Sequence, residues 1–216
     1  MKVMAINGGP RKEWNTASML KKVLEGSAAK GATTELVNLY DLDFQGCTSC
    51  FACKLKAGKS YGKCAMRDDL TPVLQRIEEA DALVLGSPIY FGCVTGELRS
   101  MIERLLFQYL RYTKDHRTSV PHPIKTAWVY TTNCPEESYG NVGYDRYFKE
   151  NEQLMRFLDS GDPETIFSAE TLQFEDYSKV DSEMFDVDAR QKRHEEIFPQ
   201  DLQKAFALGT RLSTKK

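Results

Sequence analysis

The sequence predicts an α/β fold in which helices cover both faces of a parallel sheet. The segments Lys2–Asn7 and Leu83–Leu85 are short and mostly apolar, without the alternation of a half-exposed strand. A glycine-containing loop and an amphipathic helical pattern follow the first segment, and an aromatic loop, Ile89–Gly92, follows the second. Ligands of open α/β sheets bind at the carboxyl ends of strands, so these two loops are the first candidates for a binding site.

Length, charge balance and the length of apolar runs limit the class of protein that this chain can be. The 216 residues suit a single domain, 1–216, with a cysteine-rich loop at 46–66 and a C-terminal extension from about 175 to 216. Basic and acidic side chains nearly balance, 29 against 31, which argues against a nucleic-acid partner. The apolar runs are too short for a membrane span or a signal peptide. We therefore expect a cytoplasmic protein whose six cysteines do not form disulfides.

The first loop has the features of a phosphate site. It spans Gly8–Thr16 and precedes a helix predicted over Ala17–Lys30. A strand, a tight loop and a helix aim backbone N–H groups and the positive end of the helix at one point, which suits a phosphate. Arg11 can add a forked, charge-assisted contact, and Asn15 and Thr16 can add side-chain donors. The alternative is that Asn15 or Thr16 only caps the helix. The loop lacks the glycine–lysine pattern of nucleoside-triphosphate sites and the three-glycine pattern of dinucleotide sites.

The remaining strands and helices are predicted from the periodicity of apolar residues and from residues that begin or end an element. Pro88 ends the central strand because it cannot donate to a ladder, and Thr95 is placed to cap the next helix. We predict further strands over 34–39, 125–132 and 168–174, and helices over 69–80, 97–110 and 144–158, with a last helix from Pro199. We predict that residues 178–195 wrap the surface without a strong helical period. The aromatic stretch Tyr139–Tyr144 is predicted to be either a lid over the site or a plain loop.

The two loops together resemble those of the flavodoxin-like NAD(P)H-dependent FMN reductases, close to the iron–sulfur flavoprotein branch and its cluster-free relatives. The residues that carry the resemblance are GGPRKEWNT, from Gly8 to Thr16, and SPIYFGCVTGELRSMIER, from Ser87 to Arg104. The likeness covers residues 1–135 well. It implies a three-layer sandwich whose five-stranded parallel sheet has the order 2-1-3-4-5, with FMN where the order reverses.

The resemblance also assigns residues to the cofactor. It puts Pro10, Arg11, Asn15 and Thr16 at the FMN phosphate, with Gly9 where the family usually has serine, so that only the backbone N–H remains there. It puts six residues against the flavin ring: Ser87, Pro88, Ile89, Tyr90, Phe91 and Gly92. Thr131, Thr132 and Asn133, at the end of the fourth strand, are weaker candidates. Hydride transfer to a flavin needs no protein acid or base, and we assign no catalytic residue.

The cysteines form the most unusual motif of the chain. Cys47, Cys50 and Cys53 follow a CxxCxxC spacing, and Cys64 comes ten residues later. This spacing resembles ferredoxin-type ligation of a 4Fe–4S cluster and the cluster motif of iron–sulfur flavoproteins, although their last gap is shorter. The alternatives are zinc and free or redox-active thiols, and we favour free thiols over the cluster. Nearby lysines such as Lys54 could lower the pKa of these thiols or belong to a solvated loop.

These features predict an FMN-dependent oxidoreductase that takes electrons from NAD(P)H and passes them to a quinone, a flavin or another acceptor. The alternative is a non-enzymatic electron-transfer flavoprotein, with or without a 4Fe–4S cluster, that accepts electrons from a ferredoxin. A third possibility is a flavin-free binding domain with a degenerate site. The apolar end of the helix at 105–112 and the resemblance both lead us to expect a homodimer or homotetramer.

Overall fold

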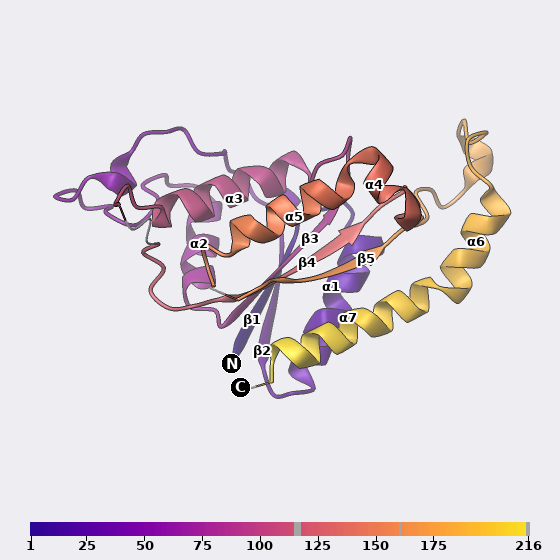
Figure 1. Cartoon of the computed structure of the whole chain (residues 1–216), viewed down its shortest axis with the longest axis horizontal. Helices are drawn as coiled ribbons and strands as arrows, with labels where there is room; N and C mark the ends of the chain where they lie inside the picture. Colours follow the sequence, from indigo (N-terminus) through magenta and orange to yellow (C-terminus); the bar gives the residue numbers. More distant parts are fainter. Residues whose placement is uncertain (115–117, 160, 215–216) are drawn as a thin grey trace.

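The computed structural model describes residues 1–114, 118–159 and 161–214. Five parallel strands form one sheet of order β2-β1-β3-β4-β5, as predicted (Figure 1). The strands are β1 (Lys2–Asn7), β2 (Thr33–Asn38), β3 (Ala82–Pro88), β4 (Lys125–Thr131) and β5 (Glu164–Ser168). The first strand lies between β2 and β3, so the chain reverses direction across the sheet at the junction of β1 and β3. Ligands of this topology bind at that junction.

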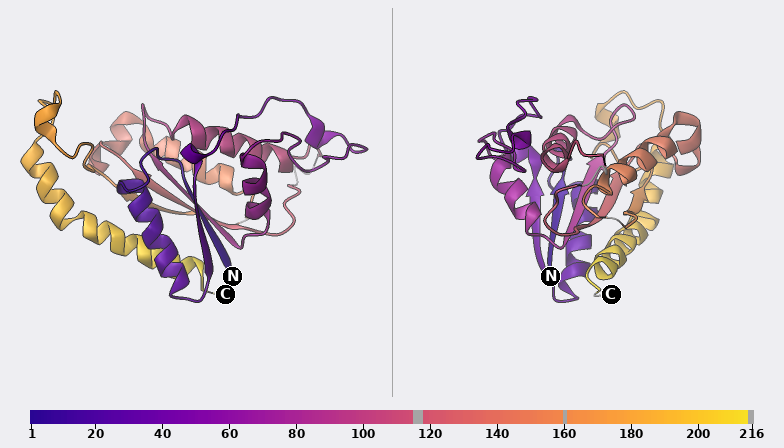
Figure 2. Two further views of the ribbon diagram at one scale, coloured as in Figure 1. Left: turned by 180° about the vertical axis from the view of Figure 1, so that it is seen from behind. Right: turned by 60° about the vertical axis from the view of Figure 1, so that its left-hand side comes forward.

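Two helical layers enclose the sheet (Figure 2). Alternate side chains of β1, β3 and β4 point to opposite faces, so each face has its own apolar core. One face packs against α1 (Asn15–Ala28) and α7 (Phe198–Leu212). The other packs against α2 (Leu70–Glu78), α3 (Gly96–Tyr109), α4 (Tyr139–Val142) and α5 (Tyr144–Met155). The fold is therefore the predicted flavodoxin-like three-layer sandwich.

The contact between α1 and α7 is unusually close. A Cβ added to Gly209 would lie 1.9 Å from the carbonyl oxygen of Val23, and one added to Gly26 would lie 2.0 Å from that of Phe206. The Ser27 hydroxyl donates to the Gly209 carbonyl across this contact. The last helix, which the sequence placed in a C-terminal extension, thus packs directly on the main sheet layer.

Two sequence predictions in the C-terminal third are wrong. The fifth strand occupies Glu164–Ser168 rather than 168–174, because it begins after Pro163 and ends before Glu170, which adopts a left-handed backbone with φ +49°. Residues 178–195 contain a helix, α6 (Val187–Glu196), where none was predicted. Asp186 caps this helix through a hydrogen bond from Ala189 N, and only Arg190 within it is buried. A helix with so few buried residues carries no apolar period.

The cysteine-rich loop and α6 lie at opposite ends of the long axis of the molecule (Figures 1 and 2). Short 3-10 helices lie in the loops between the main elements. They are η1 (Leu39–Asp41), η2 (Ala52–Lys54), η3 (Glu136–Ser138) and η4 (Tyr177–Lys179). In the described part of the chain, the helices are too short or too polar to cross a bilayer.

Candidate functional site

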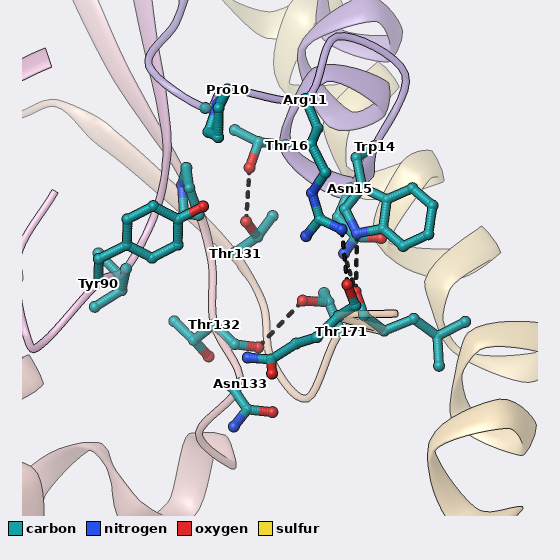
Figure 3. Close-up of a pocket in the computed structure, with 15 residues that line it drawn as sticks. Pro10, Arg11, Trp14, Asn15, Thr16, Tyr90, Thr131, Thr132, Asn133 and Thr171 are labelled. Carbon is teal, nitrogen blue, oxygen red and sulfur yellow. Dashed lines mark hydrogen bonds between the residues drawn. The ribbon is translucent and has the colours of Figure 1, made fainter. Parts of the chain in front are cut away.

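A pocket lies at the carboxyl ends of β1, β3 and β4, where the topology places a ligand site (Figure 3). We call it the strand-end pocket. Its lining residues are Gly9, Pro10, Arg11, Trp14, Asn15, Thr16, Pro88, Ile89, Tyr90, Thr131, Thr132, Asn133, Thr171, Leu172 and Gln173. The structure therefore brings together all the predicted cofactor residues except Ser87, Phe91 and Gly92. The pocket has a volume of about 50 Å³, which suits a group of a few heavy atoms such as a phosphate.

The loop after β1 is fixed by hydrogen bonds to the segment after β5. Arg11 Nη1 donates to the Gln173 carbonyl at 2.7 Å, and Asn15 Nδ2 donates to the Leu172 carbonyl at 2.7 Å. Trp14 Nε1 also donates to the Leu172 carbonyl, at 3.0 Å, and its ring lies 4.4 Å from the Arg11 guanidinium (Figure 3). Two side chains assigned to the phosphate thus also hold the opposite wall of the pocket.

The alternative that Asn15 or Thr16 merely caps α1 is not what the structure shows. The N-cap is Trp14, and no side chain makes a capping hydrogen bond there. Thr16 instead shares a 2.7 Å hydrogen bond with Thr131, which joins the start of α1 to the end of β4. Gly9 N–H, the backbone donor expected at the phosphate, donates to Asn7 Oδ1 at 3.0 Å. Binding of a phosphate would therefore rest mainly on Arg11, whose guanidinium has five N–H donors.

The aromatic loop after β3 is a tight hairpin. Tyr90 and Cys93 exchange two backbone hydrogen bonds, and the residues between them, Phe91 and Gly92, both have positive φ. Phe91 is fully exposed at the tip and Tyr90 is half-exposed. In the view of Figure 3, Tyr90 lies across the pocket from Arg11 and Trp14. An aromatic surface thus faces solvent at the mouth of the pocket, where a planar ring could stack.

The other residues of this loop have supporting roles. Ser87 is buried, and its hydroxyl accepts a hydrogen bond from Thr95 N and donates to the Pro88 carbonyl. Thr95 caps α3 as predicted, by accepting from Leu98 N, and it also donates to the Gly8 carbonyl at 2.6 Å. These bonds lock the ends of β1 and β3 together.

The loop after β4 is held from the C-terminal side. Thr132 Oγ1 is hydrogen-bonded to the Tyr139 hydroxyl, and Arg190 Nη2 donates to the Asn133 carbonyl at 2.8 Å. Tyr139, predicted in a lid or plain loop, is buried at the start of α4. Four residues of the pocket were not predicted from the sequence: Trp14, Thr171, Leu172 and Gln173. The last three follow the true end of β5, so a correctly placed strand would have pointed to them.

A second pocket gathers the four cysteines of the motif. Cys47, Cys50, Cys53 and Cys64 all line it, together with Arg104 and Phe107 of α3, and we call it the cysteine pocket. In the described residues no three ligand side chains are close enough to hold a single metal ion. A 4Fe–4S cluster needs one cysteine on each iron, and four thiols around one cavity match that arrangement in kind.

The surroundings of Cys53 do not favour its thiolate. Burial raises the pKa of Cys53 despite the nearby Lys54 ammonium, so the alternative in which the lysines lower the pKa does not hold for this thiol. Lys54 Nζ instead donates to the carbonyls of Phe107 and Leu110 at the end of α3. Arg104, whose side chain is fully buried, donates to both Asp68 carboxylate oxygens and to the Gln45 carbonyl.

Comparison with known protein families gives one clear match. The family model described as "NADPH-dependent FMN reductase" matches residues 1–119, which is more than half of the chain. These residues include the loop after β1, the loop after β3 and the whole cysteine motif.

Individual relatives agree with that match. An iron–sulfur flavoprotein of Methanocaldococcus jannaschii is 38% identical over 104 residues, which cover 48% of this chain and 51% of the relative. The chain thus spans about half the length of the curated relatives it matches. Among solved structures, an NAD(P)H:quinone oxidoreductase from Methanothermobacter marburgensis superimposes with a TM-score of 0.71 at 18% identity, covering 100% of this chain and 98% of the other. An FMN-dependent NADH-azoreductase from Bacillus anthracis, solved with FMN, gives 0.66 at 15% identity, covering 99% and 100%. At such identities these structures support the fold alone.

Proposed function

The chain belongs to the NADPH-dependent FMN reductase family, and we propose that it is an FMN-dependent oxidoreductase that carries electrons from NAD(P)H to an acceptor. The observation that supports this most is the strand-end pocket, in which Arg11 and Thr16 meet the aromatic hairpin of Tyr90 at the β1–β3 junction. The overall reaction is NAD(P)H + H⁺ + acceptor → NAD(P)⁺ + acceptor-H₂. Bound FMN would supply the hydride and electron chemistry.

The chain's own residues would bind and orient the cofactor. Arg11 would neutralise part of the phosphate charge, and burial, which lowers the pKa of its guanidinium, still leaves it charged at neutral pH. Tyr90 and Phe91 would offer faces to the flavin ring, while Thr132 and Asn133 would border it from β4. A quinone or a second flavin is the kind of acceptor we propose.

The test is the visible spectrum of the protein purified without oxygen, recorded before and after NADPH is added. We expect a flavin band at close to one FMN per chain that bleaches with NADPH, and steady NADPH oxidation in the presence of a quinone. A flavin band that NADPH leaves unchanged would contradict the hydride step. Failure to bind FMN, even when it is supplied, would overturn the assignment of both loops.

One observation favours a second candidate. The four cysteines line one pocket, and the curated relatives carry the name iron–sulfur flavoprotein. In this alternative Cys47, Cys50, Cys53 and Cys64 hold a 4Fe–4S cluster and the protein exchanges single electrons with a carrier such as a ferredoxin. Iron and acid-labile sulfide at about four each per chain would support it. Iron-free protein with full NADPH–quinone turnover would exclude it.

We also propose that the protein is a cytoplasmic homodimer or homotetramer. A large open cavity on α3 and α5 is lined mainly by apolar side chains, among them Ile102, Leu106, Phe107, Leu110, Leu154 and Phe157. Apolar patches of this kind often mark subunit contacts. Light scattering on purified protein would measure the mass, and a monomer at micromolar concentration would contradict the proposal.

A further inference from the structure

A groove borders the strand-end pocket on the C-terminal side, and we call it the C-terminal groove. It has a volume of about 620 Å³, which is within the usual range for small-molecule sites. Asn133 lines both the groove and the strand-end pocket. In Figure 3 the Asn133 side chain points away from Arg11. Cys134 and Tyr144 also line the groove. Every lining residue falls between 133 and 193, outside the segment that matches the family model.

Part of the groove wall is apolar and exposed to solvent. Val142 of α4 is 52% exposed and Met184, before α6, is 80% exposed. Tyr144 and Phe185 add aromatic surface on the two sides. Figure 1 shows α4 and the chain leading into α6 at the same end of the molecule, beyond the carboxyl end of β4. A flat aromatic ring would cover these side chains and remove apolar surface from water.

The two arginines that line the groove differ in how their charges are compensated. Arg190 is only 9% exposed, and its two terminal nitrogens donate to the carbonyls of Asn133 and Thr171, at 2.8 and 3.4 Å. Arg193 is paired with the buried Asp201 carboxylate at 2.9 Å. The Asp201 carboxylate thus neutralises the Arg193 charge, whereas the carbonyls occupy the donors of Arg190 and leave its charge uncompensated.

The two carboxylates of the groove are less fully bonded than its two arginines. Glu170 and Asp186 line it, and Asp186 accepts one hydrogen bond, from Ala189 N. Glu170 is held in a left-handed backbone that a glutamate rarely adopts. Burial raises the pKa of the Cys134 thiol, with Glu137 and Glu170 adding to the effect, so the thiol in the groove is uncharged at neutral pH. Among the charges that line the groove, Arg190 can offset one carboxylate and Arg193 is neutralised by Asp201, so Glu170 and Asp186 leave an excess of one negative charge.

We propose that the C-terminal groove binds the ring of the electron acceptor beside the cofactor, and that it accepts uncharged planar aromatic compounds while rejecting anionic ones. This inference rests on the proposed oxidoreductase function and specifies its acceptor. For a quinone, the hydride of NAD(P)H and one proton from solvent convert the quinone to the hydroquinone, and NAD(P)⁺ is released. Specificity then arises from like-charge repulsion at Glu170 and Asp186.

Binding can be tested without turnover. FMN-loaded protein is titrated calorimetrically with naphthalene-2-methanol and with naphthalene-2-sulfonate, which share a ring and differ in charge. We expect the neutral compound to bind about tenfold more tightly, and the gap to shrink as salt rises. The double variant Glu170→Gln, Asp186→Asn should bring the two affinities to within about threefold, because asparagine retains the helix cap. The matched control is Glu183→Gln, an exposed neighbour outside the groove, which should leave the gap unchanged.

The apolar wall gives an independent test. Met184→Gln and Val142→Asn should each weaken both naphthalenes by a similar factor of about three, since each removes apolar contact without adding charge. Val180→Asn, also on the exposed surface but outside the groove, is the control. Val142 and Met184 are both exposed, so folding should be retained in the Met184→Gln and Val142→Asn variants.

Turnover connects the groove to the reaction. With NAD(P)H as donor, 1,4-naphthoquinone should show a lower KM than its 2-sulfonate, and the double variant should reduce that difference. Equal affinity for the two naphthalenes, or loss of their binding when FMN is loaded, would overturn the inference. If NAD(P)H still reduces ferricyanide in that case, the proposed function stands. Absence of flavin reduction with intact naphthalene binding would instead contradict the proposed function.

Discussion

Side-chain hydrogen bonds between the loops at several strand ends hold the strand-end pocket, whereas the cysteine pocket is formed by a long loop that Arg104, Lys54 and Gln108 attach to α3. In the first, Arg11, Trp14 and Asn15 donate to carbonyls of the segment after β5, so the chain segments that follow two strands, β1 and β5, are joined. In the second, Arg104 holds the Gln45 carbonyl and Lys54 holds the last carbonyls of α3. A third contact comes from Cys64 N, which donates to Gln108 Oε1 of α3 at 3.0 Å. The first site is formed by the ends of strands, and the second by a loop that a few polar contacts attach to one helix.

This difference affects how each pocket would respond to a ligand. A site at strand ends is formed before the cofactor arrives, because the strands are ordered by the core. The cysteine loop contains Ser49 and Phe51 with positive φ, and Cys50 between them is exposed. Strained backbone in a loop with few attachments persists when something else restrains it, and a cluster bound to four thiols would be such a restraint.

The largest expected effect concerns the buried ion pair of the cysteine pocket. Arg104→Gln should lower the free energy of unfolding by about 3–5 kcal/mol, because Asp68 loses its partner and the Gln45 carbonyl loses a donor. Arg99→Gln on the exposed side of the same helix should change it by less than about 0.5 kcal/mol. Urea unfolding followed by circular dichroism measures both. Equal, small changes would mean that the loop is held by other contacts.

The second effect concerns the strand-end pocket. Arg11→Gln should weaken FMN binding roughly 10- to 100-fold, because one charged hydrogen-bonding group contributes about 1.5–3 kcal/mol. The fold should remain, since the guanidinium makes a single surface hydrogen bond to Gln173. Lys12→Gln, next in the chain and paired with Asp41, is the control and should bind FMN as the wild type does. Fluorescence quenching of FMN gives the affinities, and an unchanged value for Arg11→Gln would remove the phosphate assignment.

The same comparison explains what could be predicted from sequence. Buried strands and the loops at their ends have strong local signals, so β1, β3 and the loops that follow them were predictable from the pattern of residues. The sheet order and the residues grouped around Arg11 and Tyr90 were predictable from the family resemblance that these two loops carry. Leu172 and Gln173 were not, because they act through backbone carbonyls, which no side-chain pattern marks, and because β5 was placed several residues late. Helix α6 was not predicted, because its one buried residue is an arginine and the helix therefore has no periodic pattern of apolar residues. The role of Gly9 N–H also depended on the neighbouring Asn7 side chain, which spacing alone does not reveal.

A smaller effect is expected from Lys54. Lys54→Met should cost about 1–2 kcal/mol of stability, because it removes the ammonium that donates to the last carbonyls of α3 and lies 4.5 Å from the centre of the Phe107 ring. Hydrogen exchange should speed up in residues 46–66 and stay unchanged in the loop after β1. Lys56→Met, an exposed lysine in the same loop, is the control. Faster exchange in both loops would show that the two pockets are not independent.

The smallest effect is the pH dependence of the Arg104–Asp68 pair. Burial alone would raise the pKa of Asp68, but the hydrogen bonds from Arg104 outweigh it and hold the pKa below its ordinary value. A carboxyl group with a depressed pKa stabilises the fold above its unfolded pKa of about 4, and the contribution disappears as pH falls through the folded pKa. The difference in Tm between wild type and Asp68→Asn should therefore be constant from about pH 7 to pH 5 and shrink below about pH 4. In the Arg104→Gln background this dependence should be weaker, because the group that lowers the pKa of Asp68 is gone. A difference that stays constant to about pH 3 would show that the pKa of Asp68 is not depressed by the pair.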